Sequence, residues 1–276
     1  MTTDSHSIAA AILAAYDNQR QITPISDGDP AFGLDAAYRI SDAVMSARIA
    51  RGERPIGWKI GFTNRTIWDE YGVHAPIWGP VYDTTLHFID GARDTVHLDA
   101  TAFVEPRIEP EIVFRFAQTP RPDMDERELL GCIDAIAHGF EIVQSIYRDW
   151  RFAPADTAAA FAMHGALVCG KLAPVAGTDP DRWIDALATV EIALLRDGGE
   201  VDRGVGANVL DSPLSALRHF VAGMASCPIS RGIEAGDLVT TGTVTRAFPV
   251  RNGESWATAI DGLPLPPLNI AFASAS

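Results

Sequence analysis

The sequence predicts an α+β protein in which a helical N-terminal region, residues 1–55, precedes a β-rich body, residues 56–276. Within residues 7–20 and 34–51, apolar residues recur at the spacing of amphipathic helices. After Pro55, short apolar runs alternate with Gly, Pro and Asp, a pattern typical of strands and their turns. We therefore expect a mostly β body, closed or sandwich-like, behind two N-terminal helices.

The first half of the chain has recognisable boundaries for most of its elements. The second N-terminal helix ends at Arg51-Gly52, where glycine is a common C-terminal cap. A later helix is expected over about residues 124–137, and the apolar stretch F-E-I-V-Q-S after it is predicted to be a strand. Strands are expected over residues 57–62, 85–90 and 107–116.

The second half begins with a predicted hairpin over residues 189–203, which turns at Asp197-Gly198-Gly199. A helix is expected to begin at Ser212-Pro213, because serine suits the N-cap and proline the first turn. Strands are expected near residues 237–241, 246–250 and 254–261, the last pairing back on its predecessor across the Asn252-Gly253 turn.

Composition excludes several classes of protein. The chain has 276 residues, 47% of them hydrophobic, which is enough for a substantial core. Its formal net charge of −14 disfavours a nucleic-acid partner and an anionic membrane surface, since both require a basic face. No run approaches the roughly 18–20 apolar residues of a membrane span.

The remaining sequence signals indicate a soluble cytoplasmic protein. The N-terminal stretch is too acidic, and its apolar run too short, for a signal peptide. Cys132, Cys169 and Cys227 are widely spaced and form no C-x-x-C pair, so buried thiols fit better than disulfides or zinc. The stretch G-A-L-V-C-G-K-L has phosphate-loop spacing, but it is apolar and lacks the final Ser or Thr.

The stretch E-P-R-I-E-P-E-I, residues 105–112, places four charged residues on one face of a strand: Glu105, Arg107, Glu109 and Glu111. A solvent-facing strand is the ordinary explanation for such alternation. The prolines in the stretch remove two backbone donors, which suits an edge or bulged strand.

A second acid favours a metal site instead. Glu141 lies in the apolar run H-G-F-E-I-V-Q, where a lone carboxylate is costly unless it is paired or bound to metal. If Glu109, Glu111 and Glu141 converge, their oxygens would select Mg²⁺ or Mn²⁺ over zinc. Lys59 is also unusual, because it lies between two glycines in the apolar G-W-K-I-G. The alternative explanation is that the Lys59 side chain extends to solvent.

These segments together resemble the hydratase/decarboxylase branch of the fumarylacetoacetate hydrolase superfamily. The resemblance covers most of the chain, and P-R-I-E-x-E-I joined to G-x-K-I-G is its most specific part. The other matching segments are W-G-P-V-Y-D, G-F-E-I-V, G-V-G-A-N-V-L-D-S-P and A-G-D-L-V-T-T-G-T. The resemblance implies a mixed, strongly bent β-sheet with a helical N-terminal region, in a homo-oligomer.

The resemblance also implies a set of site residues. Mg²⁺ or Mn²⁺ would bind Glu109, Glu111 and Glu141. Lys59 and Asp83 would be catalytic and paired with each other. Thr243, next to Gly242, would lie against the substrate.

The chain departs from the branch at A-F-A-M-H-G, residues 160–165, where the hydratases carry an Asn-x-Ser-type segment. Phe161 and Met163 predict a more apolar pocket. His164 is either a new acid/base that contacts the substrate or a packed residue at the end of a strand.

The activity that the resemblance implies is metal-dependent addition of water to a 2-hydroxy-2,4-dienoate, in the catabolism of aromatic or cyclic compounds. The same site would also support decarboxylation of a 4-oxalocrotonate-like 2-oxo acid. Hydrolysis of a C–C bond is a third possibility, and it would need a base such as His164. A protein that only binds a 2-oxo acid is the non-enzymatic alternative.

Overall fold

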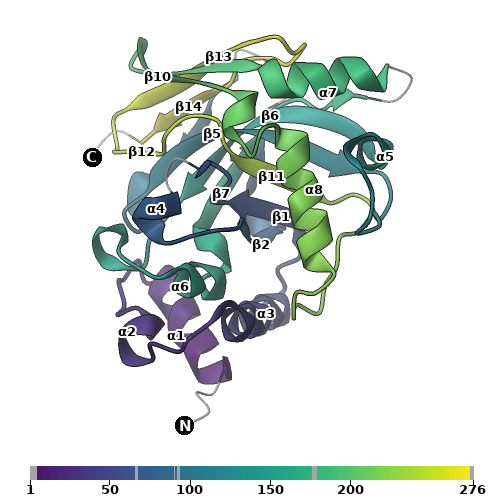
Figure 1. Cartoon of the computed structure of the whole chain (residues 1–276). Coiled ribbons are helices and arrows are strands. Elements are labelled where there is room, and N and C mark those ends of the chain that lie inside the picture. Colours follow the sequence, from purple (N-terminus) through teal and green to yellow (C-terminus); the bar gives the residue numbers. More distant parts are fainter. Residues whose placement is uncertain (1–4, 66–67, 90, 92–93, 176–178, 274–276) are drawn as a thin grey trace.

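The computed structural model describes residues 5–65, 68–89, 91, 94–175 and 179–273. A large curled sheet lies at the centre, a smaller sheet covers one end of it, and the N-terminal helices gather at the opposite end (Figure 1). The architecture is α+β with a mixed sheet, as predicted.

Among the described residues, nine strands form the large sheet, whose main path runs β2-β1-β11-β5-β6-β7-β3. Strand β12 pairs with β5 and β8 with β6. The β1–β11 and β3–β7 pairs are parallel and the others antiparallel. The strands are β1 (Pro55–Gly61), β2 (Ile77–Tyr82), β3 (Leu86–Phe88), β5 (Arg107–Phe116), β6 (Ile133–Val143), β7 (His164–Cys169), β8 (Ala173–Pro174), β11 (Leu238–Thr243) and β12 (Phe248–Pro249).

The smaller sheet has the order β10-β9-β13-β14-β4 in the described part of the chain. Its strands are β4 (Val96–Leu98), β9 (Glu191–Arg196), β10 (Gly199–Val205), β13 (Ser255–Asp261) and β14 (Asn269–Phe272). A buried histidine joins the two sheets: His138 of β6 contacts the Glu111 carbonyl of β5 through Nδ1 and the Thr258 hydroxyl of β13 through Nε2, each at 2.9 Å. His138 thereby anchors the sheet that carries the predicted metal ligands to the smaller sheet.

Helices α1, α2, α3 and α6 lie together at the N-terminal end, and α5, α7 and α8 lie along the sheets (Figure 1). Gly52, just beyond α3, has φ +93°, which is the expected C-terminal glycine. Ser212 accepts a hydrogen bond from Leu214 N–H and caps α8, also as expected. The helices are α1 (Ser5–Asp17), α2 (Ile25–Gly28), α3 (Leu34–Ala50), α4 (Trp68–Tyr71), α5 (Glu126–Leu130), α6 (Pro154–Ala159), α7 (Pro180–Thr189) and α8 (Pro213–Met224).

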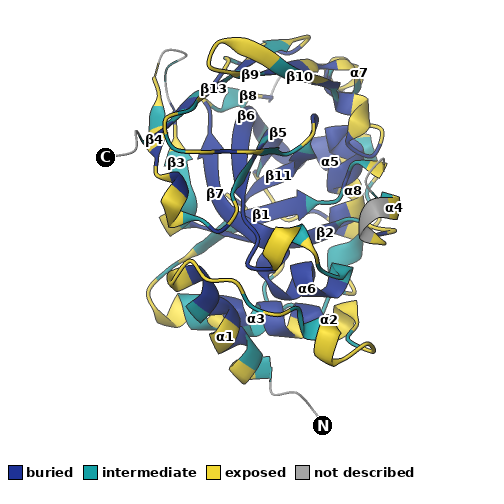
Figure 2. Cartoon of the chain, turned by 90° about the vertical axis from the view of Figure 1, so that its left-hand side faces the viewer, coloured by how far each residue is buried: buried dark blue, intermediate teal, exposed yellow. Residues whose placement is uncertain are grey.

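The N-terminal helices and the large sheet share one apolar core. Figure 2 shows the central strands β2, β5, β6, β7 and β11 of the large sheet almost wholly buried, while exposed residues lie mainly on the outer helices, the loops and the smaller sheet. Tyr16 of α1 illustrates the contact, because its ring lies 4.6 Å from that of Phe161, which directly precedes β7 in a short turn. The helical region therefore forms part of the support for the sheet.

Two predicted elements are wrong in part. Residues 124–137 contain only the short α5, and β6 begins at Ile133. This strand is flanked by β5 and β7 and is buried on both faces, so it lacks the alternation that marks a half-exposed strand. The strand at residues 254–261 is present as β13, but it pairs with β9 and β14, while β12 pairs with β5.

The sequence predicted that β5 is an edge or bulged strand; it is not an edge strand, but its pairing with β11 contains a register irregularity. Strand β5 lies between β11 and β6, and the register irregularity is in β11, between Thr240 and Thr243. Pro110 lies opposite Phe140 of β6, and its carbonyl accepts from Val244 N–H just beyond the irregularity. The neighbouring strand has therefore adapted to the proline. The hairpin at Asp197-Gly198, by contrast, is confirmed, and both residues have positive φ.

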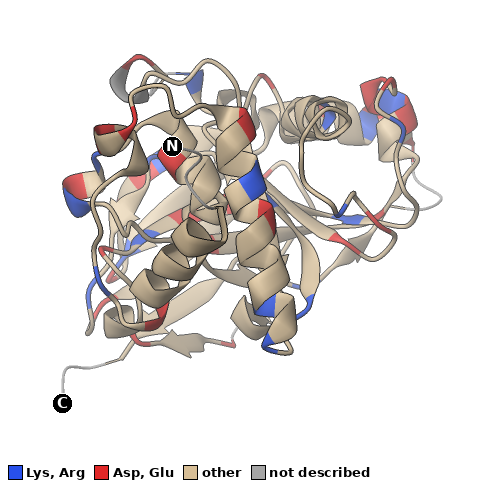
Figure 3. Ribbon diagram, turned by 90° about the horizontal axis from the view of Figure 1, so that it is seen from below, with Lys and Arg blue, Asp and Glu red and all other residues tan. Residues whose placement is uncertain are grey.

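The described residues include no helix long and apolar enough to cross a membrane. Seen from the helical end, acidic and basic side chains are interspersed, and the basic ones do not gather into one face (Figure 3).

Candidate active site

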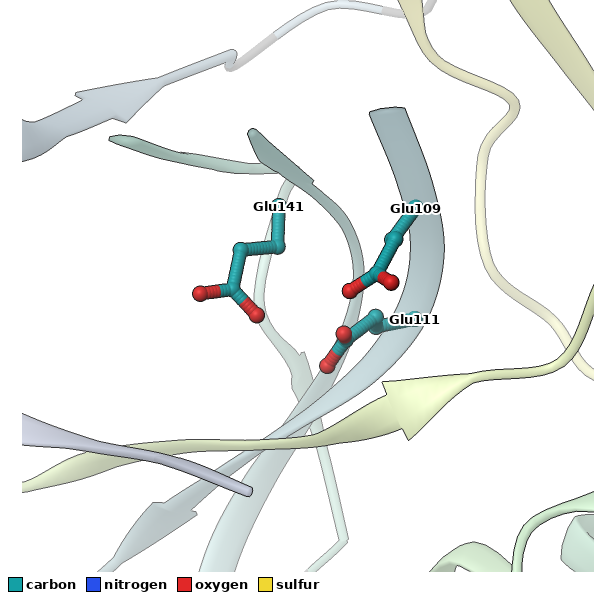
Figure 4. Close-up of side chains that lie close together, drawn as sticks. All are labelled: Glu109, Glu111 and Glu141. Carbon is teal, nitrogen blue, oxygen red and sulfur yellow. The ribbon is translucent and has the colours of Figure 1, made fainter. Parts of the chain in front are cut away.

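Three carboxylates converge on the inner face of the large sheet. Glu109 and Glu111 lie two residues apart on β5, and Glu141 lies opposite Glu109 on β6. One oxygen of each lies within 4.8 Å of the others, and the side chains point toward a common centre (Figure 4). The structure thus brings together the three residues that the sequence predicted as metal ligands.

Glu141 is fully buried and lies between two basic side chains. Its Oε1 lies 3.0 Å from His164 Nδ1, and its Oε2 lies 3.2 Å from Lys59 Nζ. Burial opposes ionisation of Glu141, but Lys59 and the hydrogen bond from His164 outweigh it and lower its pKa. Glu141 is therefore ionised at neutral pH.

Lys59 is the buried cation of this cluster. Its ammonium group donates to the Ala162 carbonyl at 3.0 Å and lies beside Glu141. Burial favours the neutral amine, yet the charges of Glu141, Glu109 and Glu111 prevail and raise its pKa. Lys59 therefore stays protonated and serves as a hydrogen-bond donor within the cluster.

Glu111 is positioned by the backbone of β11. Its Oε2 accepts a hydrogen bond from Gly242 N–H at 2.8 Å. Gly242 has φ +94°, and a Cβ there would overlap Thr63 Oγ1, so only glycine fits this position without a shift.

Two buried oxygens in the cluster have no hydrogen-bond partner: Glu111 Oε1 and Glu141 Oε2, the latter near Lys59 but not aligned for a hydrogen bond. Burial and the neighbouring carboxylates raise the pKa of Glu111, and burial raises that of Glu109 to about 7. One ammonium group does not neutralise three carboxylates, and unpartnered buried oxygens are costly. An all-oxygen donor set of this kind fits a hard divalent cation.

A cavity of about 250 Å³ opens onto the cluster. Lys59 and Glu109 contribute its charged wall, and the apolar walls come from several loops and strands. Thr243 lines the cavity, as expected for a residue next to substrate. The apolar lining includes Phe62, Val143, Trp150, Phe152, Ala162 and Met163.

The residues of the divergent A-F-A-M-H-G segment have different environments. Met163 lines the cavity as predicted, but Phe161 packs in the core against Tyr16. His164 is fully buried beside Glu141 and does not line the cavity, so the structure favours the packed alternative for this residue over substrate contact.

The expected pairing of Lys59 with Asp83 is not present. Asp83 accepts hydrogen bonds from the backbone N–H and the Nε of Arg54, each at 2.9 Å. Lys59 lies opposite Gly79 in the β1–β2 pair, four residues from Asp83, or roughly 13 Å along the strand. The two motifs are close in sequence, but Lys59 and Asp83 are not in contact.

Glu105 leaves the predicted four-residue charged face, whereas Arg107 lines the same cavity as Glu109. Glu105 has φ +45° and accepts from Gln21 and from Asp149 N–H, outside the cluster. The Arg107 guanidinium lines the cavity and stacks over the Trp150 ring at 4.1 Å.

Sequence reasoning missed the groups that support the site. Thr85 contacts His164, the Ala162 carbonyl accepts from Lys59, and Gly242 N–H binds Glu111. The one available signal was the divergence of residues 160–165, which includes both Ala162 and His164.

No protein-family model matches the chain. It is 32% identical over 253 residues to a 2-hydroxyhexa-2,4-dienoate hydratase of Comamonas testosteroni, covering 91% of this chain and 92% of that one. It is 32% identical over 233 residues to a 4-oxalocrotonate decarboxylase of Pseudomonas sp, covering 84% and 85%. A 2-keto-4-pentenoate hydratase of Paraburkholderia xenovorans is 30% identical over 258 residues, covering 92% and 90%.

Solved structures agree in fold. A 4-oxalocrotonate decarboxylase from Pseudomonas putida G7, complexed with magnesium and adipate, superimposes with a TM-score of 0.87 at 25% identity, covering 97% of both chains. A fumarylpyruvate hydrolase from Pseudomonas aeruginosa, in complex with Mn²⁺ and pyruvate, shares the fold with a TM-score of 0.59 at 18% identity, covering 80% and 90%.

The curled sheet with its buried carboxylates defines a fumarylacetoacetate hydrolase-like fold. Within that superfamily, the chain belongs to the hydratase/decarboxylase branch.

Proposed function

We propose that the protein is a divalent-metal-dependent hydratase that adds water to a 2-hydroxy-2,4-dienoate, or to its 2-oxo tautomer, in the catabolism of aromatic or cyclic compounds. The observation that carries this proposal is the cluster of three carboxylates, two of them fully buried and each with an unpartnered oxygen, beside a protonated lysine at the end of an apolar cavity. The sequence relatives include hydratases of such dienoates.

Glu109, Glu111 and Glu141 would hold Mg²⁺ or Mn²⁺. When bound, the ion would supply Lewis-acid polarisation of the substrate's carboxylate and C2 oxygen. The magnesium in the decarboxylase structure at 25% identity supports this choice of ion.

Lys59 would bind the substrate and deliver a proton. An ammonium group has three hydrogens; the Ala162 carbonyl accepts one and Glu141 lies beside the group as an ion-pair partner, which leaves hydrogen-bonding capacity for the cavity that Lys59 lines. Because its pKa is raised, Lys59 is suited to stabilise negative charge that develops on the 2-oxo group and to protonate carbon. Thr243 would orient the substrate or the added water, and the apolar walls would exclude bulk solvent.

Decarboxylation of a 4-oxalocrotonate-like acid is the second candidate. Arg107 favours it, because this guanidinium lines the cavity, stacks on Trp150 and forms no ion pair with a described carboxylate. A substrate with a second carboxylate would provide that partner. C–C bond hydrolysis is less well supported, since His164, its candidate base, does not line the cavity.

A panel of 2-hydroxy-dienoates with and without a distal carboxylate tests the proposal. With Mg²⁺ or Mn²⁺ we expect loss of the dienoate absorbance without CO₂ release, and full inhibition by a chelator. One CO₂ per substrate consumed would assign the decarboxylase instead. Binding of 2-oxo acids without any turnover would leave only a binding protein.

We also propose that the enzyme works in the cytoplasm as a homo-oligomer, as the resemblance implies. Analytical ultracentrifugation of the full chain would test the assembly, and a purely monomeric protein at micromolar concentration would contradict it.

A further inference from the structure

The two fully buried carboxylates of the cluster are held in the same manner. Glu111 has Oε2 tied to Gly242 N–H and leaves Oε1 without a partner. Glu141 has Oε1 tied to His164 and leaves Oε2 without a hydrogen bond. In each case one oxygen accepts a hydrogen bond from the protein and the other accepts none, although Glu141 Oε2 also lies 3.2 Å from the Lys59 ammonium group.

The hydrogen bond to Glu141 comes from a chain of groups. His164 Nδ1 lies 3.0 Å from Glu141 Oε1, and His164 Nε2 lies 2.8 Å from Thr85 Oγ1. A carboxylate accepts hydrogen bonds and donates none, so the 3.0 Å contact with Oε1 requires a hydrogen on Nδ1. On the other side of the ring, Nε2 is in contact with the Thr85 hydroxyl.

This contact gives Thr85 a defined role. Its hydroxyl lies 2.8 Å from His164 Nε2 and 3.0 Å from the Tyr82 carbonyl, so it ties the ring to the backbone at the end of β2. A ring held at Nε2 keeps Nδ1–H directed at Glu141, and without the hydroxyl the ring loses that anchor.

We propose that His164 and Thr85 act as a positioning pair that fixes Glu141 with Oε1 turned to the protein and Oε2 presented, as a monodentate ligand, to the divalent ion. The inference rests on the proposed metal-dependent function and goes beyond it, because it assigns to the divergent segment a role in metal affinity. Neither residue lines the cavity, and both act through Glu141.

A fixed carboxylate lowers the cost of binding the ion. The glutamate side chain has several rotatable bonds, and a ligand already held in its bound orientation loses less conformational freedom when the ion binds. Groups that orient a metal ligand in this way commonly change metal affinity by about 10–100-fold when they are removed. We expect effects of that size here.

The test is Mn²⁺ titration of the metal-free full chain, followed by electron paramagnetic resonance of the unbound ion. His164→Leu should weaken Mn²⁺ binding about 10–100-fold. His164→Asn should retain most of the affinity, because the asparagine amide nitrogen lies as many bonds from Cβ as Nδ1 does. His164→Gln, whose amide corresponds to Nε2, should lose it.

Thr85 provides a second, independent pair of variants. Thr85→Val keeps the side-chain shape but removes the hydroxyl and should weaken binding, whereas Thr85→Ser should not. His87→Asn is the matched control, because His87 is a partly buried histidine on the adjacent β3 that does not line the cavity. Thermal unfolding of each metal-free variant would establish that it is folded before its affinity is compared.

The outcomes distinguish a failure of the positioning role from a failure of the metal-dependent function. Equal Mn²⁺ affinity in wild type, His164→Leu and Thr85→Val would overturn the positioning role and leave the metal-dependent function intact. Absence of Mn²⁺ and Mg²⁺ binding to the wild type would overturn both. Equal losses in His164→Asn and His164→Leu would show that the site tolerates no change of shape there, and would refute the specific role of Nδ1–H.

Discussion

Lys59 and Glu141 form a fully buried ion pair, 3.2 Å between Nζ and Oε2, although their strands β1 and β6 are not neighbours. Two strands, β11 and β5, lie between them, so in a flat sheet the backbones would be roughly 14 Å apart at ~4.8 Å per strand. Both side chains lie on the inner face of the curled sheet, and the curvature brings their ends together.

Replacement of Lys59 tests whether it serves the chemistry or only the charge balance. Lys59→Met should lower kcat by at least about 100-fold, in the range typical of a lost proton donor, and change Mn²⁺ affinity less than about tenfold. Steady-state kinetics and Mn²⁺ titration would measure the two effects separately. The chain has one other lysine, the exposed Lys171, and Lys171→Met is the control. Unchanged turnover in Lys59→Met would refute its catalytic role.

Removal of one ligand charge should have opposite effects on metal binding and stability. Glu111→Gln should reduce Mn²⁺ affinity by more than the ~100-fold upper range for residues that only orient a ligand. The metal-free protein should become more stable by about 1–3 kcal/mol, since a buried like charge is lost. Calorimetric titration and urea unfolding measure these changes. Glu105→Gln, in the same motif but outside the cluster, should alter neither.

The metal-free protein should lose stability as pH rises through the carboxylate range. The pKa of Glu109 in the folded protein is about 7, against an ordinary value of 4.5, so the folded state holds more protons between these values. Stability is therefore greatest below about pH 4.5 for this group and falls toward pH 7, by up to about 1.4 kcal/mol per pH unit.

Urea unfolding between pH 5.5 and 8 would measure this slope, and a chelator would keep the protein metal-free. Saturating Mg²⁺ should reverse the trend, because the ion binds the deprotonated carboxylates and its affinity grows as pH rises. A stability of the metal-free protein that increases across this range would contradict the raised pKa values of the cluster.

Gly242 is expected to be intolerant of any side chain. Gly242→Ala would combine the strain of φ +94° with an overlap at Thr63 Oγ1, and it would displace the N–H that binds Glu111. Gly236→Ala is the matched control, because Gly236 has φ +95° and open space around it, so that only the strain, about 1–2 kcal/mol, applies. Gly242→Ala should lower both the melting temperature and the Mn²⁺ affinity more than Gly236→Ala does. Similar losses in the two would indicate backbone strain alone.

Asp83 should be dispensable for turnover, although the resemblance implies a catalytic role. Its partner Arg54 has a side chain that is 81% exposed, and such surface pairs contribute at most about 1 kcal/mol. Asp83→Asn should therefore change kcat less than about threefold, as measured with the substrate identified in the panel. A loss of about 100-fold would restore the role that the resemblance implies.

The convergence of the three carboxylates could be predicted because it depends on local rules. Alternation along one strand places Glu109 and Glu111 on the same face, and the cost of burying a lone acid singled out Glu141. The pair between His164 and Thr85 spans 79 residues and depends on the parallel β3–β7 pairing, which no motif encodes. The expected pairing of Asp83 with Lys59 failed for a related reason: a motif near Lys59 in sequence says little about where its side chain lies.

The contact between Tyr16 and Phe161 has a consequence for the design of truncated or chimaeric forms of this enzyme. Phe161, Ala162 and Met163 all have positive φ, and this left-handed turn presents the carbonyl that binds Lys59 and a side chain that lines the cavity. Helix α1 packs directly against that turn. We expect a fragment that starts at residue 56 to be readily proteolysed within this turn. Residue 55 is therefore a poor crossover point for chimaeras, because exchanging the N-terminal helices would also exchange the packing that supports the turn whose Met163 lines the cavity.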